Sequence, residues 1–203
     1  PFHTDLHPLG MQVAAACESE VREYAVADSQ LDLIRRFGVR APFQNSNGQP
    51  VVISQPVSLV KYSNGGHLLA VVTGKVVQIF HMLKDDLDGH TPASPCRVMA
   101  LCDHVSTVTD IAFMRDDNRM VTISSDGCVY SWMMGGVGRD KEFIYKGIAA
   151  TRVAVSTHHI DKCIIAVCFE GAAVETVQTL AADIVKRRRQ SSVAVRTTSR
   201  HSL

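Results

Sequence analysis

An Asp-Gly pair between two runs of alternating apolar and polar residues constrains the fold of this chain most tightly. Asp126 and Gly127 follow the run Met120–Ser125 and precede the run Cys128–Trp132. Asp-Gly in such a place is a strong sequence signal for a β-hairpin, because the two-residue turn needs backbone with positive φ. A third alternating run, Val108–Phe113, precedes Met120–Ser125, and a short polar turn separates these two runs. The segment therefore predicts three antiparallel strands joined by tight turns.

The same strand–turn–strand frame recurs in weaker form three more times. Corresponding anchor residues are Leu6, Tyr62, Phe113 and Val155, at spacings of 56, 51 and 42 residues. A four-stranded blade of a β-propeller takes about 40–50 residues. The first spacing is long because the polar segment Phe43–Gln49 intervenes, and its Asn and Gly content predicts a loop.

The best of these repeats, residues 104–132, resembles a WD repeat. In that family a His, a Ser or Thr, an Asp and a Trp form a chain of hydrogen bonds inside the blade, and the matching positions here are His104, Thr122, Asp126 and Trp132. The resemblance implies that the imidazole links the carboxylate to the hydroxyl, and that the hydroxyl accepts from the indole N–H. Each buried polar group then has a partner.

The segments Leu6–Gly10, Tyr62–Leu68 and Asp126–Trp132 extend the resemblance to residues 2 to about 180. Their order is similar to that in the cilia- and flagella-associated protein 57 family, in which WD propellers precede a coiled coil. This resemblance implies a non-enzymatic scaffold for protein–protein interactions on the axoneme of a cilium or flagellum, linked to inner dynein arms. A cytoplasmic WD adaptor that recruits partners to another multiprotein complex is the alternative.

The predicted fold is thus an all-β WD-repeat β-propeller with about four blades of an incomplete ring. Its predicted parts are a degenerate blade (1–37), a second blade with its linker (38–101), the best-matching blade (102–140), a degenerate blade (141–180) and a basic Ser/Arg-rich tail (181–203). Arg97–Leu101 is the best fourth strand of a blade, and Val39–Ala41 and Phe143–Tyr145 are weaker candidates. An incomplete ring leaves apolar faces uncovered, so we expect further blades from elsewhere and self-association without them.

Composition excludes several classes of function. A net charge of +1 over 203 residues does not indicate electrostatic attraction of the whole chain to nucleic acid or to a membrane surface. The apolar runs are shorter than the roughly 20 residues of a membrane helix, and no secretory signal is recognisable. The six cysteines contain no Cys-x-x-Cys, which argues against a structural zinc and for a reducing compartment, consistent with the cytoplasm or the axoneme.

Several clusters have the residue types of a reactive site. His3–His7 and His158–Asp161 have spacings that a metal could use, but both fall in or beside predicted turns. His104 with Asp126 could suggest a catalytic dyad, whereas the repeat frame makes them a structural pair. Gly135–Gly138 follows a strand end with no helix pattern after it, which indicates a connector rather than a phosphate-binding loop. We therefore predict no catalytic residue, metal, cofactor or small-molecule substrate.

The C-terminal tail carries the basic run Lys186–Arg189. A solvated tail is the main interpretation, and a nuclear signal or a phosphate contact is the alternative. Arg188 and Arg189 lie just before Ser191, which makes Ser191 a candidate phosphorylation site. A phosphate there would add about two negative charges beside the basic run.

Overall fold

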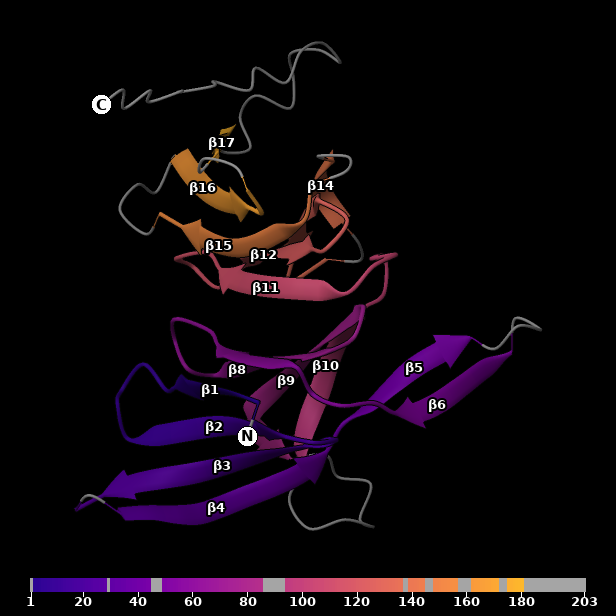
Figure 1. Ribbon diagram of the computed structural model, residues 1–203. Coiled ribbons are helices and arrows are strands. Elements are labelled where there is room, and N and C mark those ends of the chain that lie inside the picture. Colours follow the sequence, from indigo (N-terminus) through magenta and orange to yellow (C-terminus); the bar gives the residue numbers. More distant parts are fainter. Residues whose placement is uncertain are drawn as a thin grey trace. The chain divides into compact units, whose positions relative to one another are not determined.

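The computed structural model describes residues 2–28, 30–44, 49–85, 94–136, 139–144, 148–156, 162–171 and 175–180. Every regular element in these ranges is a β-strand, and the strands form antiparallel sheets (Figure 1). The all-β prediction is confirmed. The chain divides into two compact units, Pro1–Val108 and Thr109–Leu203, which are described in turn.

The first sheet of the first unit contains four strands paired in chain order. These are β1 (His3–Leu6), β2 (Gln12–Cys17), β3 (Glu20–Ala27) and β4 (Gln30–Gly38). Glu18 and Asp28 have positive φ in the tight turns that join β2 to β3 and β3 to β4. Short meander turns of this kind keep sequence neighbours adjacent in the sheet.

The second sheet also pairs its strands in chain order. It consists of β7 (Leu59–Tyr62), β8 (Leu68–Thr73), β9 (Val76–Asp85) and β10 (Pro95–Leu101). All six residues of β8 are buried, as expected for a strand covered on both faces. The prediction of a fourth strand at Arg97–Leu101 is confirmed, since these residues pair with β9.

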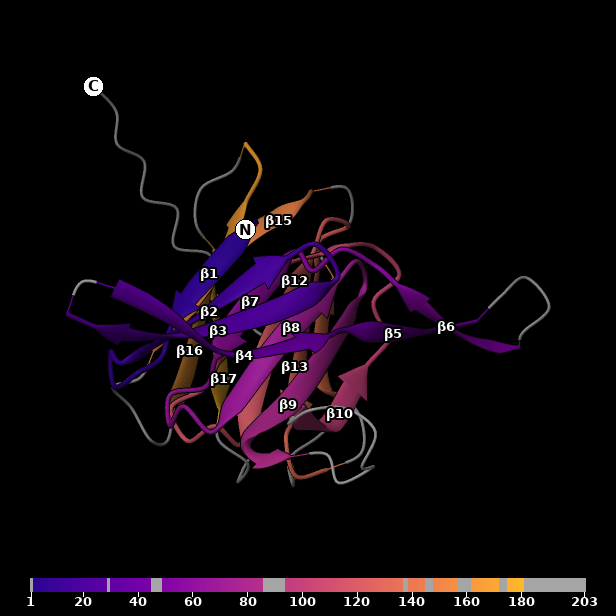
Figure 2. The same cartoon turned by 90° about the horizontal axis from the view of Figure 1, so that it is seen from below.

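In the sequence between these two sheets, the chain forms a separate hairpin of β5 (Arg40–Gln44) and β6 (Pro50–Ser54). This hairpin projects away from both sheets (Figures 1 and 2). The prediction of a fourth strand at Val39–Ala41 is therefore wrong, because β4 takes that place. The predicted loop at Phe43–Gln49 is also partly wrong, since its first two residues end β5. Strand β4 was not predicted because most of its side chains are exposed. An outer strand of this kind needs no regular alternation of apolar and polar residues.

The two sheets of the first unit pack face to face. Small side chains of β2, Ala14 and Ala16, belong to the same buried cluster as Leu69 and Val71 of β8 and Phe80 of β9. The alanines let the sheets approach closely, and the larger side chains opposite fill the space. Dense packing of this kind is what stabilises one blade against the next.

The second unit contains a four-stranded and a three-stranded sheet. Its strands are β11 (Val108–Phe113), β12 (Arg119–Ser124), β13 (Cys128–Met133) and β14 (Arg139–Ile144), then β15 (Ala150–Val155), β16 (Lys162–Phe169) and β17 (Glu175–Leu180). The Asp-Gly hairpin is confirmed: Ile123 pairs with Val129, and Gly127 has a φ of 81°. Strand β14, the fourth strand of the four-stranded sheet, begins at Arg139, earlier than the predicted start at Phe143.

A hydrogen bond recurs at the repeat spacing that the sequence predicts. The hydroxyls of Ser58, Thr109 and Thr151, each close to the start of the first strand of a sheet, donate to backbone carbonyls of the second strand at 3.1–3.3 Å. Their spacings of 51 and 42 residues equal those of the anchor residues. Phe2 stands at the corresponding position of the first sheet, so that sheet departs from the other three.

Candidate functional site

The predicted hydrogen-bond chain is centred on Trp132 and Thr122, and the structure brings these two together. The indole Nε1 of Trp132 on β13 donates to Thr122 Oγ1 on β12 at 2.8 Å, and both side chains are buried. Tyr130 meets the Trp132 ring edge-on, with centroids 5.9 Å apart, and the Arg139 guanidinium lies 4.4 Å above Tyr130. The pair therefore sits inside a packed aromatic cluster rather than in an accessible cleft.

Asp126 holds the turn between β12 and β13. Its Oδ1 accepts a 2.5 Å hydrogen bond from Ser124 Oγ and a 3.2 Å bond from the backbone N–H of Cys128. Partial burial by itself raises the pKa of Asp126, but these hydrogen bonds outweigh burial and hold it below its ordinary value. The carboxylate is thus charged at neutral pH and acts as a turn acceptor.

His104 belongs to the first unit, whereas Thr122, Asp126 and Trp132 belong to the second. His104 is buried, at 2% exposure. Burial suits a structural histidine better than a general base that must reach a substrate. The complete chain of hydrogen bonds from His104 to Trp132 stays a prediction. The Trp132–Thr122 hydrogen bond is the part of it that the structure shows.

The predicted metal-like segment His3–His7 instead joins the first sheet to the second. The Asp5 carboxylate accepts from the backbone N–H of Tyr62 at 2.7 Å and from Lys61 Nζ at 3.0 Å. His3 Nδ1 accepts from the N–H of Val60 at 3.5 Å. These side chains therefore connect neighbouring sheets, a role that their spacing in the sequence does not reveal.

Among the residues that the structure describes, no group of three or more His, Cys, Asp or Glu side chains could hold a metal ion. No helix within the same residues could span a lipid bilayer. Gly135 and Gly136 follow β13. Val137 and Gly138, the cluster His158–Asp161, the basic run Lys186–Arg189 and Ser191 lie outside the described residues.

A buried polar network that the sequence did not predict lies between the two sheets of the first unit. Glu23 on β3 is 3% exposed, and its Oε1 accepts from the Tyr62 hydroxyl at 2.8 Å. Arg35 Nε on β4 lies 3.6 Å from Glu23 Oε2, and Arg35 donates to the carbonyl of Met82 at 3.0 Å. Glu23 lies two residues after buried Val21, on the same face of β3, and this placement is the signal that could have identified it.

Burial and the neighbouring Glu23 carboxylate raise the pKa of Tyr62. A raised pKa in the folded state means that the neutral phenol stabilises the fold fully below the ordinary value of about 10, and that this contribution is lost as the pH rises further. We expect the free energy of unfolding to fall above about pH 10, and to fall less in a Tyr62→Phe variant. Urea unfolding from pH 8 to pH 11 measures both; equal alkaline losses would contradict the assignment.

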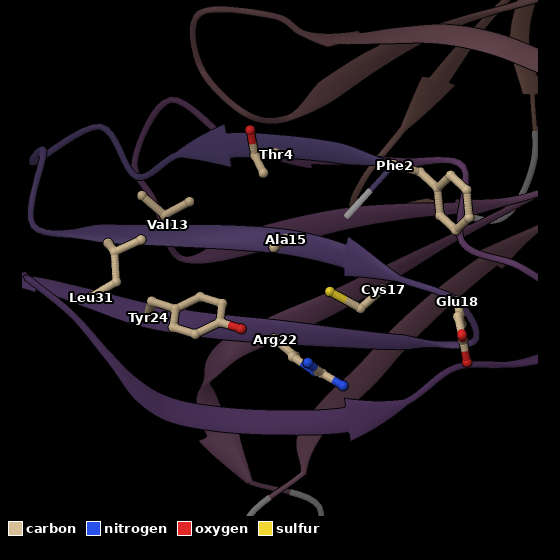
Figure 3. Close-up of a pocket in the computed structure, with 9 residues that line it drawn as sticks. All are labelled: Phe2, Thr4, Val13, Ala15, Cys17, Glu18, Arg22, Tyr24 and Leu31. Atoms are coloured by element: carbon tan, nitrogen blue, oxygen red, sulfur yellow. The ribbon is translucent and has the colours of Figure 1, made fainter.

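The first sheet also carries an open face on the side away from the second sheet (Figure 3). Val13, Ala15 and Cys17 of β2 define this face, with Thr4 and Tyr24 beside them, and enclose part of a hollow of about 620 Å³. Large apolar side chains in and around this sheet are exposed: Phe2, Leu6, Leu9, Met11, Leu31 and Leu33. Exposed apolar side chains beside a hollow mark an interaction site more often than a catalytic one.

No protein-family model matches the chain. It is 24% identical over 155 residues to cilia- and flagella-associated protein 57 of Mus musculus, a match that covers 76% of the chain and 10% of the mouse protein. The chain thus spans about a tenth of the length of this relative. Among solved structures it is similar to the WD40 repeats of RRP9, with a TM-score of 0.62 and 16% identity, over 88% of the chain and 50% of that structure.

It is also similar to the β-propeller domain of Cps50 (Swd1) from Myceliophteria thermophila, with a TM-score of 0.66 and 11% identity. That match covers 88% of the chain and 52% of the domain. The fold is therefore that of a partial WD-type β-propeller, and the sequence resembles that of cilia- and flagella-associated protein 57. The predicted partial propeller fold and the predicted resemblance to this family are both confirmed.

Proposed function

We propose that this protein is a non-enzymatic scaffold of the ciliary or flagellar axoneme, where it binds axonemal or dynein-associated proteins. The match to cilia- and flagella-associated protein 57 over 76% of the chain is the observation that carries this proposal. The architecture supports it. The polar side chains that the sequence offers as reactive, such as Asp5 and Asp126, are engaged in holding strands and turns.

A role in inner dynein arm assembly or motility follows from the same resemblance. The contacts between the sheets suit a rigid platform, because Asp5 and Glu23 fix the first sheet to the second through hydrogen bonds. A rigid platform that presents apolar and loop surfaces is suited to assembling other proteins. The alternative is a WD adaptor in another cytoplasmic complex, which the WD-type fold supports equally.

Fractionation of cilia separates the two functions. An epitope-tagged full-length protein expressed in ciliated cells should remain with detergent-extracted axonemes, because a scaffold bound to microtubule-associated partners resists extraction. A soluble cytoplasmic WD protein carrying the same tag serves as the control and should be released. Quantitative release of the full-length protein would overturn the axonemal function and favour the adaptor.

A further inference from the structure

Two buried polar atoms on one face of the second sheet call for a hydrogen-bond partner. Thr73 ends β8 and Gln78 lies in β9, and both residues are 0% exposed. Gln78 pairs with Val71, so Thr73 is its diagonal neighbour on the same face of the sheet. Thr73 Oγ1 and Gln78 Nε2 have no hydrogen-bond partner among the residues that the structure describes. Because buried polar groups of native proteins are almost always paired, the two atoms point to a ligand between them.

An arginine fixes the orientation of the Gln78 amide. Arg97 Nη1 on β10 donates to Gln78 Oε1 at 3.0 Å. Turning the amide over would set its NH2 group against the guanidinium, which is a donor against a donor. Reorienting Gln78 therefore does not satisfy its Nε2, and the NH2 group requires an acceptor other than Arg97.

The third sheet has such an acceptor at the corresponding place. Strands β8 and β12 are both six residues long, and Thr73 and Ser124 are their last residues. The Ser124 hydroxyl donates to Asp126 Oδ1 at 2.5 Å, in the turn that follows β12. Gln78 corresponds in the same way to Tyr130, since each pairs with the fourth residue of the preceding strand. A carboxylate oxygen thus lies beside the hydroxyl that corresponds to Thr73.

The turn of the second sheet supplies no carboxylate. It consists of Gly74 and Lys75, one residue fewer than the turn Ser125–Gly127, and neither carries an acceptor side chain. A hollow of about 340 Å³ opens beside this turn, and Gly74, Lys75 and Val76 are among the residues that line it. Val76 pairs with Thr73 across the turn. The hollow therefore gives water a path to the neighbourhood of Thr73.

We propose that an ordered water molecule bridges Thr73 and Gln78 within the second sheet. Its oxygen accepts a hydrogen bond from Gln78 Nε2, and one of its hydrogens is donated to Thr73 Oγ1. The water takes the place that the Asp126 carboxylate has in the third sheet. Buried waters typically join two to four polar groups in this way, whereas an anion would lose its hydration beside two fully buried side chains. The inference goes beyond the scaffold function and does not depend on it.

A crystal structure at a resolution that shows buried waters tests the proposal directly. We expect an electron-density peak within about 3.2 Å of both Thr73 Oγ1 and Gln78 Nε2. Thr73→Val removes the hydroxyl and nearly keeps the shape of the side chain, so crystals of this variant should lose the peak and retain the Arg97–Gln78 hydrogen bond. A direct hydrogen bond between Thr73 and Gln78, or no peak in the unchanged protein, would overturn the proposal.

Melting temperatures provide a second test, whose sign separates a bridged hydroxyl from an unbridged one. With the water in place, Thr73→Val takes away one of its partners and should lower the melting temperature by at least about 2 °C. An unbridged hydroxyl gives the opposite result, because replacing an unpaired buried polar group by an apolar one stabilises a fold. Thr107→Val, at an exposed threonine, is the matched control and should change the melting temperature by less than about 1 °C. An unchanged or raised melting temperature for Thr73→Val would contradict the bridging water.

Discussion

Replacing Trp132 with alanine should lower the free energy of unfolding of the second unit more than any other single substitution in it. Truncating a buried aromatic side chain costs about 3–5 kcal/mol through the cavity that it leaves. Trp132 is 2% exposed and donates to Thr122 at 2.8 Å, so the variant also loses a buried hydrogen bond worth about 1–3 kcal/mol. The sum is comparable with the whole stability of a small domain.

Urea unfolding of the 203-residue chain, followed by circular dichroism, measures the Trp132→Ala effect. Thr122→Val is the matched control, because it removes the hydroxyl while nearly conserving volume. We expect it to cost about 1–3 kcal/mol, the hydrogen-bond part alone. An unchanged free energy of unfolding for Trp132→Ala would show that the blade assigned to residues 104–132 is wrong.

The third repeat shows why its fold could be predicted from the sequence. Its strands alternate regularly, its turn carries Asp126-Gly127, and its Trp132 and Thr122 stand where cross-strand pairing brings them together. Local signals suffice there because each hairpin joins strands that are neighbours in the sequence. The same signals correctly place β12 and β13.

The features that escaped prediction depend on contacts between sheets. His3 and Asp5 have metal-like spacing, yet they accept backbone N–H groups of a strand more than 50 residues away. Strand β4 lacks alternation because it lies at the outer edge of its sheet, where burial does not select a pattern. Pairing between distant strands is set by tertiary packing, and no local spacing encodes it.

Replacing Glu23 with alanine should destabilise the first unit by about 2–4 kcal/mol. Breaking one side of a buried ion pair costs about 3–5 kcal/mol, and the partial exposure of Arg35 reduces that cost. The variant also takes the acceptor away from the Tyr62 hydroxyl, which lies in the core between the two sheets. Urea unfolding at neutral pH measures the change, and Arg22→Ala at an exposed ion pair of the same strand is the control, with an expected loss much smaller than that of Glu23→Ala.

A double-mutant cycle tests whether Glu23 and Tyr62 act as one unit that joins the sheets. If the hydroxyl and the carboxylate are mutual partners, Glu23→Leu with Tyr62→Phe should cost less than the sum of the two single changes, because neither buried polar group is left behind. The expected coupling is about 1–3 kcal/mol. Strictly additive losses would mean that the two side chains are stabilised separately. In that case Asp5 and the apolar cluster, and not the Glu23–Tyr62 bond, would hold the first sheet to the second.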